Sequence, residues 1–150
     1  MKKFVFRLEK VLKHKLRLFE IAQAKHLEAM NLLKDEEDKL ESFRINYKEC
    51  LNDLSAKTSG NFQVRDLGPF YRYLSFTKKE IAIQSKIVCE AMEKEDELKK
   101  SLLVIAKEKE ILIKLKEKEY GKYIYQTSKE EQYFLDELNS LKYARTTGGI

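Results

Sequence analysis

Long stretches without glycine or proline are the feature that most constrains the fold of this chain. Neither residue occurs from Met1 to Ser59, from Phe70 to Tyr120 or from Lys122 to Thr147. Because Gly and Pro most often interrupt regular structure, we expect helices to run through these blocks. The charged residues, 37% of the chain, suit long helices with solvated faces.

The segment from Ser55 to Pro69 is rich in turn-forming residues and predicts a connection between two helices. Pro69 follows Gly68 and suits the first position of the second helix, where its missing N–H costs nothing. The expected boundaries are a helix over about residues 3–55, a connection over 56–68, a second helix over about 69–144, and a flexible tail over 146–150, with residues 1–145 forming a single hairpin.

Apolar residues recur at heptad spacing in both blocks. One series in the first block runs every seven residues from Val5 to Leu54, and a companion series runs from Leu8 to Cys50. The second block repeats the pattern from Phe70 to Leu112, after which we expect it to slip by one residue and resume at Tyr120. Two heptad helices joined by a short connection most simply fold back on each other. The prediction is an all-α fold, in which two long helices form an antiparallel coiled-coil hairpin and the second, longer helix overhangs.

The predicted pairing places Leu54 opposite Phe70, so that every position of the heptad seam meets another seam position. The same alignment places Lys15 opposite Lys109, which is unfavourable unless both ammonium groups reach solvent. His26 also occupies the seam, where a polar residue more often fixes the register than performs catalysis. The sequence defines this register to within one heptad.

Several classes of function are excluded by the pattern. Arg7 interrupts the apolar cluster Phe4-Val5-Phe6 too early for a secretory signal, and no stretch is apolar enough to span a membrane. Cys50 and Cys89 lie too far apart along the predicted hairpin for a disulfide, which fits a reducing, cytoplasmic compartment. No metal-ligand spacing and no catalytic motif is present. We therefore expect no catalytic residues, no cofactor, no metal and no enzyme activity.

Aromatic and basic residues gather at the two ends of the predicted hairpin. The aromatic residues near the bend span more than one helix face, so some of them must be exposed or bind a partner. From Met1 to Lys25, eight Lys or Arg residues stand against two Glu, whereas the middle of each helix is acidic. The acidic middle argues against a nucleic acid running along the helices, although a nucleic-acid-binding arm remains an alternative.

The opening stretch FVFRLEKVLKHK, residues 4–15, resembles the amino terminus of the flagellar export protein family FliJ. Its aromatic-x-aromatic-basic-Leu-x-x-Val-Leu pattern is met by residues 4, 6, 7, 8, 11 and 12. The stripe Leu40, Phe43 and Tyr47 before the bend and the aromatic restart at Phe70 and Tyr73 are also similar. The resemblance extends over essentially the whole chain and depends most on the first twelve residues.

The resemblance implies a non-catalytic coiled-coil stalk of the flagellar type III export apparatus. Such a stalk inserts into a hexameric export ATPase, engages the cytoplasmic domain of the membrane export gate and escorts export chaperones. It would lie in the cytoplasm at the flagellar basal body, on the inner face of the membrane, without inserting into it. Nucleic acid is not an expected partner; the alternatives are the injectisome equivalent of the stalk and a generic coiled-coil scaffold.

Carried onto this sequence, the resemblance implies two contact sites. The ATPase-binding candidates are Arg7, Lys10, Lys13 and Arg17. The candidates for binding the export gate are Phe43, Tyr47, Phe70 and Tyr73.

Overall fold

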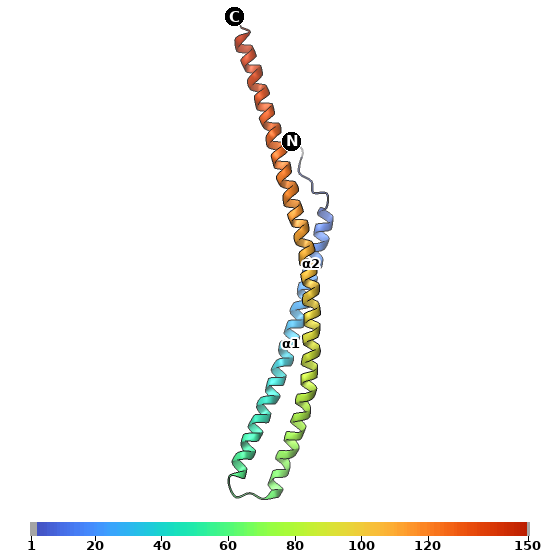
Figure 1. Ribbon diagram of the computed structural model, residues 1–150, viewed down its shortest axis with the longest axis vertical. Helices are drawn as coiled ribbons and strands as arrows, with labels where there is room; N and C mark the ends of the chain where they lie inside the picture. The colour runs from blue at the N-terminus through green and yellow to red at the C-terminus, as the bar shows by residue number, and fades with distance from the viewer. Residues whose placement is uncertain (1–2, 150) are drawn as a thin grey trace. The chain divides into compact units, whose positions relative to one another are not determined.

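The computed structural model describes residues 3–149. Within this range it contains two helices, α1 (Glu9–Thr58) and α2 (Val64–Thr147), and no strand (Figure 1). The chain divides into two units that are described separately. Unit 1 comprises Met1–Phe19 and Ile105–Ile150, and unit 2 comprises Glu20–Val104.

In each unit, the α1 segment runs antiparallel to the α2 segment. Unit 1 pairs Glu9 with Lys116 and Lys15 with Glu108. Unit 2 pairs His26 with Glu95. As the residue number rises along α1, the number of its partner in α2 falls. The predicted all-α antiparallel hairpin with a longer second helix is therefore confirmed, since α2 has 84 residues and α1 has 50.

The seam of the hairpin follows the heptad series. Leu12 is buried in unit 1, and Leu40 and Leu74 are buried in unit 2. The predicted seam positions from Leu8 to Leu54 and from Phe70 to Leu112 are all buried or half-buried. The seam is shallow, because no large side chain in the described residues falls below 2% exposure. Burial of one apolar stripe per helix is thus what holds each pair together.

The helices extend further toward each other than the sequence predicts, and only residues 59–63 connect them (Figure 1). The hydroxyls of Thr58 and Ser59 donate to the carbonyls of Ser55 and Ala56, at 3.1 and 2.8 Å. These bonds satisfy carbonyl groups of the last helical turn, so the turn-forming residues cap α1 rather than interrupt it. The predicted connection over 56–68 is accordingly too long.

Pro69 lies inside α2, not at its first position as predicted. The helix begins five residues earlier, at Val64, and the backbone N–H of Asp66 donates to the carbonyl of Gln63 at 2.9 Å. Proline is tolerated here because it is only in the second turn and removes a single helical hydrogen bond.

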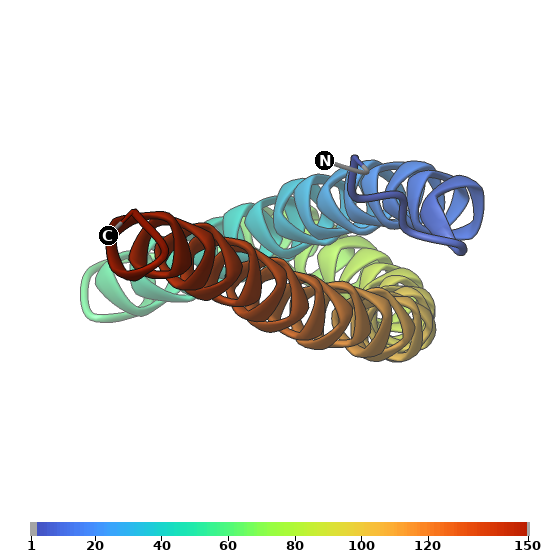
Figure 2. The same cartoon turned by 90° about the horizontal axis from the view of Figure 1, so that it is seen from above.

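The amino terminus is extended rather than helical, so the predicted helix from about residue 3 begins too early. Residues 3–6 precede α1 as a non-helical segment (Figures 1 and 2). Phe6 is buried and Val5 is 80% exposed, the alternation of an extended chain. The ring of Phe4 lies 5.2 Å from that of Tyr120 and 5.5 Å from that of Tyr123. The aromatic side chains therefore hold this segment against α2 within unit 1.

The predicted slip of the heptad pattern occurs later than Tyr120: Thr127, a position of the resumed series, is half-buried, but the earlier positions of that series are not. The half-buried positions continue as Lys116, Glu119 and Tyr123, whereas Tyr120 and Ile124 are about half exposed. Lys116 occupies the continuing seam with a partner from the amino-terminal segment of unit 1. It pairs with Glu9 at 2.8 Å and lies 6.0 Å from the ring of Phe6.

The carboxyl-terminal part of α2 overhangs within unit 1, as predicted: every residue from 128 to 149 is exposed. The helix ends at Thr147, slightly beyond the predicted 144, and the N–H of Gly148 donates to the carbonyl of Ala144 at 2.9 Å. The predicted tail therefore begins with helical residues. Met1, Lys2 and Ile150 lie outside the described residues.

Candidate docking surfaces

The four predicted ATPase contacts are named here the basic face of unit 1, which comprises Arg7 in the turn before α1 and Lys10, Lys13 and Arg17 on α1. Lys10, Lys13 and Arg17 follow a spacing of three and four residues, which places them on one side of α1. All four are exposed, and none forms an ion pair within the described part of the chain. Their charges are therefore free to meet an acidic partner.

The basic face points away from the hairpin seam. Leu8, Leu12 and Lys15 occupy the α2-facing side of α1, and all three are buried or half-buried. Residues 10, 13 and 17 fall roughly opposite that side at 100° per residue. A partner can therefore cover the basic face without separating α1 from α2.

The unfavourable contact predicted between Lys15 and Lys109 does not occur. Lys15 Nζ lies 2.7 Å from Glu108 Oε2, and Lys109 Nζ lies 3.8 Å from the centroid of the Phe19 ring. Each ammonium group thus has a favourable neighbour, an anion for one and an aromatic face for the other. This layer therefore holds no repulsion between lysines that an acidic partner would relieve, and support for ATPase binding in unit 1 comes from the exposed basic face.

The four predicted gate contacts do not form one surface. Phe43, Tyr47 and Phe70 are half-buried in the seam of unit 2, and only Tyr73 is substantially exposed, at 44%. Phe70 and Tyr73 line one pocket, while Tyr47 lines another beside Ile81. The expectation that some aromatic residues near the bend are exposed is confirmed by Tyr71 and Phe76, whose exposed fractions are 60% and 61%.

The pocket beside Phe70 and Tyr73 has a volume of about 390 Å³ and is called the bend pocket. Its lining residues are Asn46, Glu49, Cys50, Asp53, Pro69, Phe70 and Tyr73. Burial, together with the nearby negative charge of Asp53, raises the pKa of the Cys50 thiol. The sequence does not single out Glu49 and Asp53 as site residues, because their proximity to the rings depends on the register of the two helices. The i, i+4 spacing of Glu49 and Asp53 was the only available signal.

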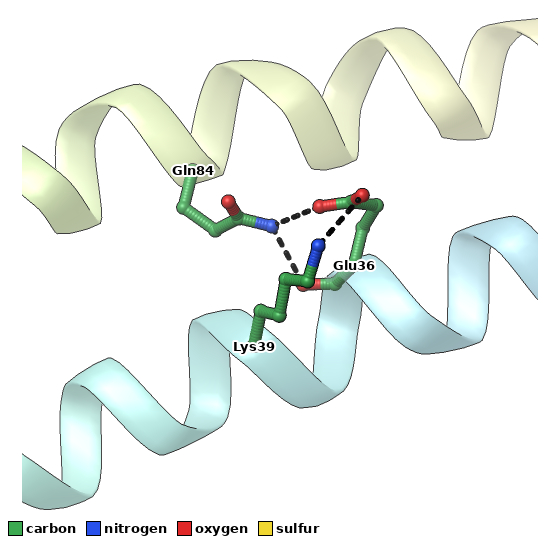
Figure 3. Close-up of polar contacts among 3 residues, drawn as sticks. All are labelled: Glu36, Lys39 and Gln84. Carbon is green, nitrogen blue, oxygen red and sulfur yellow. Dashed lines mark hydrogen bonds and ion pairs between the residues drawn. The ribbon is translucent and has the colours of Figure 1, made fainter.

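A polar cluster interrupts the apolar seam in the middle of unit 2 (Figure 3). Gln84 Nε2 donates to the backbone carbonyl of Glu36 at 3.0 Å and also to its carboxylate, which Lys39 Nζ approaches to 3.5 Å. Hydrogen bonding from Gln84, helped by the charge of Lys39, outweighs burial and holds the pKa of Glu36 below its ordinary value. One further layer of the seam joins His26 Nε2 to Glu95 Oε1 at 2.8 Å. Both layers fix which residues of α1 and α2 face each other.

We predict that the substitution Gln84→Leu raises the pKa of Glu36, because it removes both donated hydrogen bonds. The lowered pKa in the folded chain means that the Glu36 contacts stabilise the fold above the unfolded-state pKa. That stabilisation is lost as the pH falls through the lowered value, and it should be smaller in the variant. A ¹³C NMR titration of the carboxyl group measures the pKa. Gln23→Leu, at an exposed position of α1, is the matched control and should leave it unchanged.

Cys50 and Cys89 are both free thiols, as expected, and no group of three or more metal-ligating side chains occurs in residues 3–149. In the same range, neither helix contains an apolar stretch of the length and hydropathy needed to cross a membrane.

Comparison with known proteins adds one finding. Residues 3–148 match the model of a family described as flagellar FliJ protein. No curated protein and no solved structure matches the chain. The matched range includes the extended segment, both helices, the basic face and the bend pocket.

Proposed function

The chain belongs to the FliJ family of flagellar export-related proteins, and from this premise we propose that it is a non-catalytic central stalk of the flagellar export apparatus. It docks into a hexameric export ATPase through the basic face. Near the bend it binds the cytoplasmic domain of the membrane export gate, and it also receives export chaperones. It works in the cytoplasm, peripherally at the basal body.

The observation that carries the proposal is the state of the basic face. Four cations are exposed and free of ion pairs among the described residues, and three of them, Lys10, Lys13 and Arg17, lie on the side of α1 away from α2. Surface cations in this arrangement steer association with an acidic partner and set its orientation more than its final affinity. Family membership supports the identity of that partner as the export ATPase.

The gate contact is supported by unit 2. Tyr73 and Phe76 expose large aromatic surfaces close to the bend pocket, and exposed aromatic side chains are common anchors of protein interfaces. Phe43, Tyr47 and Phe70 are half-buried and act by positioning these anchors rather than by wide contact. Of the four gate candidates, only Tyr73 keeps the role of a direct contact.

Sedimentation of the purified chain with the flagellar export ATPase tests the proposal. We expect the chain to co-sediment with the hexamer, and a parallel titration with generic RNA to show little binding at physiological salt. Tight RNA binding that weakens steeply with salt, without co-sedimentation, would instead support a nucleic-acid-binding arm.

A further inference from the structure

The bend pocket combines two carboxylates with aromatic and apolar side chains. Glu49 and Asp53 are one helical turn apart on α1, and Pro69, Phe70 and Tyr73 come from the first turns of α2. Cys50 closes the pocket with a buried thiol. Both carboxylates are exposed, and neither forms an ion pair within residues 3–149. In contrast, Glu36 and Glu95 in the same unit each have a basic partner.

A cation already lies on one of the pocket's rings. Lys57 Nζ is 5.4 Å from the centroid of Phe70, although Lys57 does not line the pocket. The ring therefore attracts positive charge in the free protein. Burial, followed by the nearby negative charge of Asp53, raises the pKa of the Cys50 thiol, in keeping with the position of Asp53 in the lining.

The negative charges of the bend pocket determine which chemical group can bind there. An apolar plug would remove water from two carboxylates without replacing its hydrogen bonds, and an anion would be repelled. An elongated cation with an apolar stem matches the lining, because the stem contacts Pro69 and the rings while its head meets Glu49 and Asp53. A guanidinium group suits this lining best, since it stacks on aromatic faces and donates to two carboxylate groups at once.

We propose that the bend pocket binds an arginine side chain presented by a partner protein. The identity of that partner as the export gate depends on the proposed function, but the specificity of the pocket does not. An arginine seated here would lie beside the exposed ring of Tyr73, so it would fix the position of the partner along α2.

The test uses N-butylguanidinium as the probe and N-butylurea as its neutral isostere, each titrated into the full chain. Backbone and ring NMR shifts at Cys50, Phe70 and Tyr73 report binding. We expect saturable shifts with butylguanidinium at millimolar concentrations and about fivefold weaker binding of butylurea, as for solvent-exposed ion pairs. The combined substitution Glu49→Gln and Asp53→Asn should weaken butylguanidinium about fivefold as well.

Three further substitutions make the test specific. Lys57→Met should strengthen butylguanidinium binding about twofold, because it removes the competing cation from Phe70. Lys48→Met and Glu41→Gln remove a cation and a carboxylate from the separate pocket beside Tyr47 and Ile81. Both should leave butylguanidinium binding unchanged. Circular dichroism of each variant checks that the hairpin is intact.

Equal binding of the two probes, full binding by the double variant, or the absence of localised, saturable shifts would each overturn the proposal. None of these outcomes involves the export ATPase or the gate. If butylguanidinium binds as expected and the gate domain does not bind the chain, the arginine pocket stands and the gate assignment fails.

Discussion

Reversing three charges on the basic face should remove most of the affinity of the chain for the export ATPase. In the variant Arg7→Glu, Lys10→Glu and Lys13→Glu, we expect binding to weaken at least about tenfold and the stimulation of ATP hydrolysis to fall in parallel. Each reversal replaces an attraction worth up to about 1 kcal/mol with a repulsion. The effect should shrink at high salt, since the residues are exposed. Titration calorimetry and an ATP turnover assay at two salt concentrations measure it.

The matched control reverses three exposed cations of α2 in unit 2, namely Lys78, Lys79 and Lys86. It changes the net charge by the same amount but leaves the basic face intact, so binding and stimulation should persist. Because the substituted side chains point away from the seam, both variants should keep the helical content of the natural chain. Unchanged binding and stimulation in the first variant would remove the ATPase assignment of the basic face.

The second large effect concerns the seam of unit 2. We expect Leu40→Ala to lower the free energy of unfolding by about 2–4 kcal/mol, because it removes a buried side chain and leaves a cavity between α1 and α2. Leu32→Ala, on the same helix, should cost less than about 0.5 kcal/mol, because Leu32 is 49% exposed. Urea denaturation followed by circular dichroism measures both values. Equal costs would mean that the heptad seam is not what stabilises this unit.

The fold could be predicted because its main determinants are local. The heptad spacing of Leu12, Leu40 and Leu74 identified the buried stripe, and the blocks without Gly or Pro identified the helices. The predicted helix starts are wrong where contacts between side chains outweigh the local conformational preferences of single residues. Val5 fits the heptad, but Phe4 and Phe6 both pack inward, which requires an extended segment and turns Val5 outward. Pro69 suits a helix start, but one lost hydrogen bond does not prevent an earlier start.

The candidate sites also differ in whether local sequence or pairing between the helices determines them. The exposure of Lys10, Lys13 and Arg17 in the basic face depends only on spacing along α1, so it follows from the sequence. The gate candidates follow from the family resemblance, and sequence spacing does not show that Phe43, Tyr47 and Phe70 are half-buried while Phe76 is exposed. The bend pocket depends on which residues of α1 face Phe70 and Tyr73, and the predicted register was uncertain by a heptad. Pairing between helices, which is non-local, therefore sets the limit of prediction.

Sedimentation velocity of the natural chain with the hexameric export ATPase tests the central claim most directly. The stalk assignment predicts a complex containing one chain per hexamer, because a single helical hairpin occupies one central pore. The complex should form at physiological salt and should be lost with the three reversed charges at residues 7, 10 and 13. Failure of the chain to co-sediment with the hexamer, or saturation at six chains per hexamer, would contradict a central stalk.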